Sequence, residues 1–318
     1  MKQTGAFDIA VGAIDVGATK VLVGIADEAG NLVPNRYLRF STPSDSSQFV
    51  AQVVNALNEL TIGHTLGLVS CAAPGPLDSE SGVIINTHNR GWVAFSLGPE
   101  LSARLGVPVI LEDDATAAAV GEAIQGAGAG YNPVAYLTIS TGVGAGLVFD
   151  GKVLRGAHGL AGEVGHLVID PMGPRCGCGN NGDIESFTGG LSLASRAREF
   201  WPESHLADGT LSPRTAEDVF RLADTREDRA LSIVYAAQHA IAFAIATLAS
   251  SIDPERIVVG GSIALGQPDL IQASALSARK LCIKETGLAI DVVLAALGDR
   301  SALAGAALLG AARLGLSN

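Results

Sequence analysis

Residues 9–27 read IAVGAIDVGATKVLVGIAD, and this stretch decides the fold. Two runs of β-branched and aliphatic residues, 9–17 and 19–27, flank a turn of small residues. This pattern predicts two antiparallel strands joined by a tight turn. A third β-rich run lies around residues 37–40, after the turn-forming sequence EAGN at 28–31. The chain is therefore expected to open with a meander of three strands.

The same pattern returns in the second half of the chain. The run VAYLTIS, residues 134–140, leads through a predicted turn TGVGAG into the run LVFDG, residues 147–151. Two halves that open alike predict a duplicated α/β fold of two lobes with a ligand cleft between them. From this repeat alone we expect a smaller N-terminal lobe of residues 1–114 and 300–318, and a larger C-terminal lobe of residues 115–299.

Helical periodicity accounts for much of the remaining chain. The predicted helices cover residues 44–60, 97–105, 115–125, 189–200, 215–222, 228–252 and 301–314. The stretch 230–252 is the most membrane-like, but Gln238, His239 and several serines favour a buried helix over a membrane span. No apolar run with a small-residue cleavage site opens the chain. We expect a cytoplasmic protein without a membrane role.

The overall charge excludes one class of function. The chain has 21 lysines and arginines against 32 aspartates and glutamates, which gives a net charge of −11 and an isoelectric point near 4.9. No run of basic residues interrupts this acidic background, so the electrostatic surface that nucleic-acid binding requires is missing. We expect no nucleic-acid partner.

Three glycine-containing turns follow predicted strands. In DVGATK, residues 15–20, a strand-end carboxylate could face Mg²⁺ while backbone N–H groups face phosphate oxygens; an ordinary β-turn is the alternative. STGVGAG at 140–146 is not a dinucleotide motif, because no helix follows it. VVGGSIA at 258–264 lets backbone approach a flat ring. Together the turns predict a nucleotide site split across the chain.

The segment 158–185, HGLAGEVGHLVIDPMGPRCGCGNNGDIE, contains a candidate metal site. His166, Cys176 and Cys178 are suitable Zn²⁺ ligands, and Asp183 is near enough in sequence to complete a tetrahedron. Four cysteines in 318 residues suit a reducing compartment, and the close pair is the exception that a metal would explain. Inert loop residues are the alternative.

Three adjacent carboxylates, Glu112, Asp113 and Asp114, end a predicted strand in the sequence LEDDATAAAVGE at 111–122. One of the two aspartates could be the N-cap of the alanine-rich helix that follows. The other could be a catalytic base, since strand ends that lead into helices often carry the chemistry of α/β enzymes. Glu112 is expected to have no special role.

These motifs together resemble those of the ROK (repressor, ORF, kinase) family of sugar kinases, and its bacterial glucokinases most closely. The motifs that carry the resemblance are DVGATK, APGPLD at 73–78, DDATAAAVGE, STGVGAG, RGAHGLAGEVGH at 155–166 and CGCGNNGDIE. The resemblance covers nearly the whole chain. It implies an actin-like, ribonuclease H-like fold of two lobes, a homodimer, and a reaction between ATP and a hexose.

The resemblance also assigns roles by position. Asp114 would be the general base for the sugar hydroxyl, and Asp15 would act on Mg²⁺ through water. The residues expected to contact the sugar are Gly75, Asn89, Asp113, Glu163, His166 and Glu185. Those expected to hold the nucleotide are Asp15, Gly17, Thr19, Lys20, Thr141, Gly142, Gly260 and Gly261.

Two positions depart from the family pattern. The family usually has Asn where this chain has Asp113. A carboxylate only accepts hydrogen bonds, so it favours a ligand group that donates strongly, such as an ammonium. We expect a sugar 6-kinase that acts on an amino sugar such as 3-amino-3-deoxyglucose (kanosamine), in an antibiotic-precursor pathway; glucose is the alternative.

The second departure is Asp183, where the family commonly has a third cysteine. Zinc accepts carboxylate oxygen, so a structural Zn²⁺ site of two cysteines, one histidine and one aspartate is still expected. ATP and polyphosphate both remain open as phosphate donors. A sugar-sensing regulator is the competing class of function, but the first strand begins near residue 9 without a preceding helix-turn-helix pattern, and the chain is acidic. Asp15 and Asp114 argue against a binding-only pseudokinase.

Overall fold

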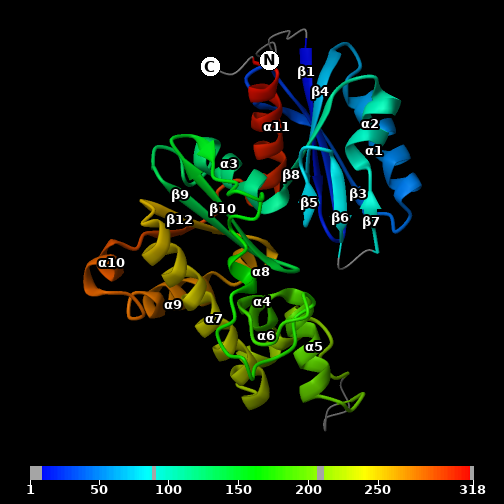
Figure 1. Ribbon diagram of the computed structural model, residues 1–318. Helices are drawn as coiled ribbons and strands as arrows, with labels where there is room; N and C mark the ends of the chain where they lie inside the picture. The colour runs from blue at the N-terminus through cyan, green and yellow to red at the C-terminus, as the bar shows by residue number, and fades with distance from the viewer. Residues whose placement is uncertain (1–8, 88–90, 206–210, 316–318) are drawn as a thin grey trace. The chain divides into compact units, whose positions relative to one another are not determined.

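The computed structural model describes residues 9–87, 91–205 and 211–315 (Figure 1). The chain forms two compact units. The first comprises Met1–Gly130, Gly151–Leu160 and Asp299–Asn318, and the second comprises Tyr131–Asp150 and Ala161–Gly298. Residues 115–130 thus group with the first unit, whereas the sequence-based division assigned them to the second.

The sheet of the first unit has the strand order β3-β2-β1-β4-β8. Its strands are β1 (Ile9–Val16), β2 (Lys20–Ala26), β3 (Leu32–Ser41), β4 (Thr65–Ala73) and β8 (Val109–Asp113). The first three strands form an antiparallel meander, and β4 and β8 run parallel to β1. A small second sheet consists of β5 (Leu77–Asp78), β6 (Val83–Asn86) and β7 (Val93–Phe95).

A second five-stranded sheet repeats this order as β11-β10-β9-β12-β13, and β9, β10, β12 and β13 lie in the second unit. Its strands are β9 (Val134–Ile139), β10 (Val143–Phe149), β11 (Lys152–Val153), β12 (Arg256–Gly260) and β13 (Val292–Leu294). Strands β9 and β10 are antiparallel, and β12 is parallel to both β9 and β13. The duplication predicted from the two meanders is therefore confirmed.

The turn between β9 and β10 is shorter than the sequence predicted. It covers only residues 140–142, because Gly144 and Gly146 already lie in β10, opposite Thr138 and Tyr136. The predicted turn TGVGAG is therefore mostly strand. Glycine weakens a strand through its entropy and missing side chain, but it can take part in every hydrogen bond of the ladder.

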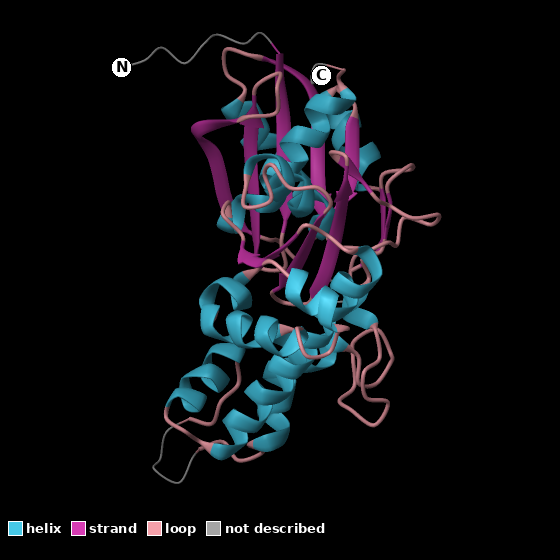
Figure 2. Ribbon diagram, turned by 90° about the vertical axis from the view of Figure 1, so that its left-hand side faces the viewer, coloured by secondary structure: helices cyan, strands magenta, loops and turns pink. Residues whose placement is uncertain are grey.

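Helices cover both faces of the first sheet; Figure 2 distinguishes them from the strands. They are α1 (Ser46–Leu60), α2 (Leu97–Leu105), α3 (Asp114–Gln125) and α11 (Ser301–Arg313), which follows the 3₁₀ turn η2 (Gly298–Arg300). Phe49 and Leu57 of α1 pack in one core, and Leu303 of α11 packs in another with Leu22. A Cβ on Gly305 would lie only 1.6 Å from the carbonyl oxygen of Ala117, so α3 crosses α11 closely, which places α3 in the first unit.

The second unit holds the remaining helices. They are η1 (Val164–His166), α4 (Ile184–Thr188), α5 (Gly190–Phe200), α6 (Ala216–Asp224), α7 (Asp228–Ile252), α8 (Ser262–Gly266), α9 (Pro268–Ala278) and α10 (Lys284–Ala289). Length and hydropathy alone would let α7 cross a membrane, but half of its most apolar window is buried inside the fold. Ile233, Ile241 and Ile245 of α7 belong to the core of this unit, as expected of a buried helix.

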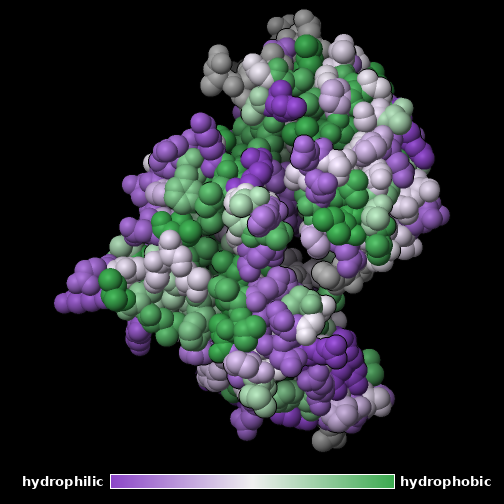
Figure 3. All heavy atoms as spheres, in the orientation of Figure 1, coloured by the Kyte–Doolittle hydropathy of each residue, from purple (hydrophilic) through white to green (hydrophobic). Residues whose placement is uncertain are grey.

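Some large apolar side chains remain on the surface, where the face drawn in Figure 3 carries both hydrophilic and hydrophobic areas. In the second unit, Leu276, Ile283 and Leu288 in and beside α9 and α10 are 58%, 71% and 72% exposed. Exposed apolar groups of this kind are common at protein–protein contacts.

Candidate active site

The first group of candidate residues lies at the carboxyl ends of three adjacent parallel strands. Asp15 of β1 pairs with Ala72 of β4, and Ala72 pairs with Glu112 of β8. Asp15 and Glu112 therefore flank one strand, at a separation of about 10 Å given the usual strand spacing. Ligands of open α/β sheets bind at such carboxyl edges.

Asp113 and Asp114 occupy different positions at the start of α3. Asp113 is the N-cap, and its Oδ1 accepts a hydrogen bond from the backbone N–H of Thr116 at 3.0 Å. Asp114 is the first residue of the helix. A Cβ on Gly75 would lie 3.6 Å from Oδ2 of Asp113, so the loop after β4 approaches this carboxylate. Asn89 lies outside the described residues.

Asp15 is the second-last residue of β1, close to the turn to β2. Burial raises the pKa of its carboxyl to about 7, against the opposing effect of Lys20, while Asp299 raises it further. The turn itself is tight: the N–H of Gly17 donates to the carbonyl of Lys20 at 2.9 Å, and a Cβ on Gly17 would lie 2.9 Å from the same oxygen. Glycine is therefore favoured at this position for steric reasons.

Lys20 forms an ion pair that the sequence did not reveal. Its Nζ donates to Oδ2 of Asp299 at 3.0 Å, and Arg39 lies 3.7 Å from the same oxygen. The hydrogen bond from Lys20 is the main reason that the pKa of Asp299 lies below its ordinary value. Nothing in the sequence pattern links two residues 279 positions apart.

Glu112, expected to have no special role, is a buried partner of Arg155. The Nε of Arg155 donates to Oε2 of Glu112 at 2.9 Å, and the Nη2 of Arg155 contacts the same oxygen. The other oxygen of Glu112 accepts from the N–H of Asp113 at 3.2 Å. This contact anchors a carboxylate next to the two aspartates, and no sequence motif links Glu112 with Arg155.

The second group of candidate residues lies in the second unit, around the turn after β9. The N–H of Val143 donates to Oε2 of Glu185 at 2.8 Å. A Cβ on Gly142 would lie 2.5 Å from that oxygen, which no side chain tolerates without moving Glu185. Thr141 joins the turn to α5, because its carbonyl accepts from the N–H of Leu191 at 3.3 Å. The turn at residues 140–142 and the carboxylate of Glu185 therefore hold each other in position.

Gly260 ends the adjacent strand β12, and Gly261 follows it as the N-cap residue of α8. Gly261 has φ +91°, a conformation that favours glycine, and a Cβ there would lie 2.4 Å from the carbonyl oxygen of Ile139. The hydroxyls of Ser140 and Ser262 lie 3.0 Å apart. The two glycine-containing turns of this unit are therefore neighbours at one sheet edge, as their parallel strands require.

The four candidate metal ligands converge in the second unit. The ligand atoms of His166, Cys176, Cys178 and Asp183 all lie within 4.8 Å of one another. His166 Nδ1 is 3.2 Å from Asp183 Oδ2 and 3.8 Å from Cys176 Sγ, and Cys178 Sγ is 3.3 Å from Asp183 Oδ2. Edges of a tetrahedral Zn²⁺ site with these donors are about 3.3–3.8 Å long, so the side chains fit the metal.

Burial and hydrogen bonds shift the pKa values of Cys176 and Asp183 in opposite directions. Burial raises the pKa of the Cys176 thiol, and its hydrogen bond to Asp183 raises it further. Burial also opposes ionisation of Asp183, but hydrogen bonds from Cys176, Ser186 and His166 outweigh it and lower the pKa of Asp183. The thiols thus donate to a carboxylate at the positions where a metal ion would replace their protons.

Asp183 has a second structural task. Its Oδ1 accepts from the N–H of Ser186 at 2.8 Å and caps α4, the helix that carries Glu185. A cysteine would not cap the helix as well. His166 likewise faces two ways, since its Nδ1 contacts Asp183 and its Nε2 lies 3.9 Å from Glu163.

Comparison of the sequence and structure with known proteins assigns the chain to a family. The ROK family model matches residues 11–313, and the chain belongs to the ROK family. A glucokinase of Halalkalibacterium halodurans is 34% identical over 273 residues, which cover 81% of this chain and 82% of that protein. An N-acetylmannosamine kinase of Escherichia coli O157:H7 is 32% identical over 302 residues, covering 93% and 97%.

A solved structure of a ROK family glucokinase from Streptomyces griseus, in complex with glucose and AMPPNP, is 30% identical in sequence. Its TM-score is 0.78, with 94% of this chain and 98% of that one covered. The predicted fold class, an actin-like α/β fold of two lobes, is confirmed by this likeness.

Proposed function

We propose that the chain is an ATP- and Mg²⁺-dependent kinase that phosphorylates the 6-hydroxyl of a glucose-configured sugar. The observation that carries the proposal is the row of carboxylates at the ends of β1 and β8, in a chain similar to glucokinases over most of its length. Asp114 is the base that accepts the hydroxyl proton as the new P–O bond forms and the bond from the γ-phosphorus to the leaving oxygen of ADP breaks. Asp15 would act on Mg²⁺ through water, and the ion would neutralise charge on the phosphates.

The remaining candidate residues bind and orient the two substrates. The sugar is held by Gly75, Asn89, Asp113, Glu163, His166 and Glu185. The phosphates are held by Gly17, Thr19, Lys20, Thr141 and Gly142, and the adenosine lies beside Gly260 and Gly261. We further propose a homodimer, to which the exposed apolar residues of α9 and α10 would contribute.

Asp113 favours an amino sugar as the substrate. An N-cap must present an oxygen to the helix, and in Asp113 this is Oδ1. An asparagine held in this way would turn its NH₂ group toward the Gly75 loop, whereas Asp113 turns an acceptor, Oδ2, to that side. A donating ligand group suits this oxygen, and an ammonium donates best. Kanosamine is our leading candidate and glucose the alternative, since a hydroxyl also donates.

A structural Zn²⁺ is proposed for the cluster of His166, Cys176, Cys178 and Asp183. It would fix the segment between η1 and α4, which carries Glu163 and Glu185 at its two ends. The role of the ion would be structural, because four protein ligands fill a tetrahedral site and leave no coordination position for substrate.

One assay tests the proposal: ADP release with glucose, kanosamine, mannose and N-acetylmannosamine, at fixed ATP and Mg²⁺. We expect kcat/KM to favour kanosamine over glucose by about tenfold, as for a charge-assisted against a neutral hydrogen bond. Asp113→Asn should abolish this preference and raise the relative activity on glucose. A glucose preference in the wild type that Asp113→Asn leaves unchanged would reject the amino sugar and leave a plain glucokinase.

The base is tested separately. Asp114→Asn should lower kcat by about 10²–10⁴-fold while glucose and kanosamine still bind. Sugar binding without formation of a sugar phosphate in the wild type, with polyphosphate as well as with ATP as donor, would instead indicate the regulator among the alternatives.

A further inference from the structure

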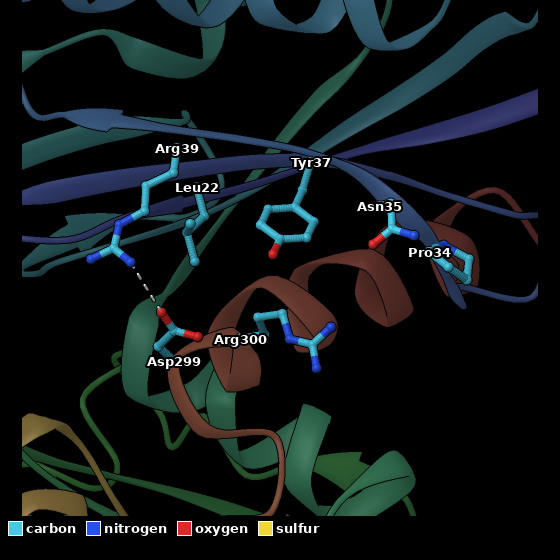
Figure 4. Close-up of a pocket in the computed structure, with 7 residues that line it drawn as sticks. All are labelled: Leu22, Pro34, Asn35, Tyr37, Arg39, Asp299 and Arg300. Carbon is cyan, nitrogen blue, oxygen red and sulfur yellow. Dashed lines mark ion pairs between the residues drawn. The ribbon is translucent and has the colours of Figure 1, made fainter.

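A cavity of about 420 Å³ opens in the first unit between strand β3 and the start of α11 (Figure 4). It is lined by Leu22, Pro34, Asn35, Tyr37, Arg39, Asp299 and Arg300. Its volume is in the range of small-molecule sites. None of these residues has a role in the proposed reaction.

The cavity exists because β3 is interrupted. Gly24 of β2 pairs with Tyr37, and Ala26 pairs with Leu32, so residues 33–36 of β3 oppose Ile25 alone. Pro34 lacks an N–H for the ladder, and Asn35 has φ +58°, which makes the strand bulge. Bulges at sheet edges often aim side chains at a functional site.

The charges around the cavity favour an anion. Two positive charges, Arg39 and Arg300, and one negative charge, Asp299, line the cavity in a chain of net charge −11. Lys20, outside the lining, shares one oxygen of Asp299 with Arg39 and so helps to neutralise it. Within the described part of the chain, Arg300 forms no ion pair or hydrogen bond, and its charge acts on Asp299 only from a longer distance. The N–H groups of the Arg300 guanidinium can therefore donate hydrogen bonds to a ligand.

The other side chains suit the organic part of a ligand. Tyr37 and Asn35 project from β3 toward the helix that begins after Arg300 (Figure 4). Tyr37 is 44% exposed, so a face of its ring is accessible. Aromatic faces bind sugar and base rings, and arginine forks bind phosphate oxygens in pairs.

We propose that this cavity binds a phosphate group, either free inorganic phosphate or that of a small phosphomonoester, held by Arg39 and Arg300 with any organic part against Tyr37. Leu22 pairs with both Asp15 and Arg39 in the sheet, so Arg39 lies two strands, about 10 Å, from Asp15. A bound anion would therefore weaken the binding of ATP phosphates by repulsion, which would make the cavity a feedback site. This last consequence rests on the proposed function; the binding itself does not.

Calorimetry on the full, nucleotide-free chain tests the binding, with inorganic phosphate and glucose 6-phosphate as probes. We expect saturable binding that Arg300→Gln weakens by about tenfold or more, the effect of one charge-assisted bond. Arg313→Gln, at the exposed far end of the same helix, is the matched control and should bind as the wild type does. Tyr37→Ser should weaken glucose 6-phosphate binding alone if the ligand is a phosphomonoester, and neither probe if it is inorganic phosphate.

Several results would overturn the proposal. One is the absence of saturable binding of either probe up to about 10 mM, and another is equal affinity in the wild type and Arg300→Gln. A third is complete exclusion of the probe by saturating AMPPNP and Mg²⁺, which would assign the phosphate to the nucleotide site. Since none of these measurements requires turnover, a failed kinase assay would leave the binding result intact.

Discussion

Arg155 donates to a buried carboxylate, Glu112, across 43 residues of sequence. Glu112 is only 6% exposed, and its second oxygen accepts the N–H of Asp113. The pair therefore fixes the backbone from which Asp113 and Asp114 project, and joins the segment after β11 to the end of β8. A charge left without its partner at a buried site is costly, so each residue depends on the other.

Glu112→Gln should destabilise the protein measurably. The amide can still accept from the N–H of Asp113, but it loses the ion pair with Arg155. Because Arg155 is half exposed, we expect a loss of about 1–2 kcal/mol in the free energy of unfolding, below the cost for a fully buried pair. Urea denaturation measures this. The control is Glu203→Gln, which removes an exposed partner of Arg229 and should change stability by less than about 0.5 kcal/mol.

A double-mutant cycle separates the ion pair from other effects. Arg155→Met combined with Glu112→Gln should be less destabilising than the sum of the two single changes, with a coupling of about 1 kcal/mol. Strict additivity would show that Arg155 and Glu112 are neighbours without an energetic interaction.

Asp15→Asn should stabilise the metal-free, nucleotide-free protein at neutral pH and above. Burial raises the pKa of Asp15 to about 7 in the folded chain, above about 3.9 in the unfolded chain. Between these values the folded state binds more protons, so the free energy of unfolding of the wild type falls as pH rises from about 4 to 7. The asparagine variant avoids this loss and should be more stable at pH 8 by a few kcal/mol, at most about 4.

The pH dependence is the decisive part of that experiment. The stability difference between Asp15→Asn and the wild type should shrink steadily as the pH is lowered from about 8 to 5. A difference that is the same at both ends of this range would contradict the raised pKa. Kinase activity should be lost in the variant at all pH values, because an amide carries no charge to face the hydrated metal.

Protein purified without a chelator should contain about one zinc per chain, and Cys176→Ala or Cys178→Ala should remove most of it. Cys282→Ala is the matched control, because Cys282 lies outside the cluster. Zinc affinity should fall as the pH is lowered, since protons compete for the thiolates. Metal analysis showing far less than one zinc in the wild type would reject the site.

Asp183→Cys separates the two tasks of this residue. A third thiolate should hold zinc more tightly than the carboxylate does. The loss of the cap on α4 should destabilise the metal-free form by about 1 kcal/mol. If the variant binds zinc no better and is as stable without metal, then Asp183 neither ligates nor caps.

The sequence predicted best what depends on local pattern. The two meanders, the helix at 228–252 and the cap at the start of α3 all follow from side-chain periodicity and polar residues at element ends, which act over a few positions. The four metal ligands could also be grouped, because they lie within 18 residues and the loop between them is rich in glycine.

Long-range pairings could not be predicted in the same way. Neither Glu112 with Arg155 nor Lys20 with Asp299 shares a motif spacing, so these pairs form only in the tertiary structure. The extent of the β9–β10 turn was wrong for a related reason. Glycine reads as a turn signal in sequence, but the ladder to β9 keeps Gly144 and Gly146 extended.

Gly142→Ala should impair activity far more than stability. The added Cβ would meet Oε2 of Glu185 at 2.5 Å, and Glu185 is also bound to the N–H of Val143. Moving this carboxylate displaces both a proposed sugar ligand and the turn proposed to hold phosphates. A displacement of about 1 Å can lower the rate on the order of a hundredfold, so we expect kcat/KM to fall by about 10–100-fold.

The matched control for Gly142→Ala is Gly266→Ala in α8, where no atom lies within 4 Å of the added carbon. Gly142→Ala combined with Glu185→Asp shortens the obstructing side chain and should recover part of the turn's geometry, seen as a lower KM for ATP than in Gly142→Ala alone. If Gly142→Ala and Gly266→Ala show the same kcat/KM, the carboxylate of Glu185 is not part of the working site.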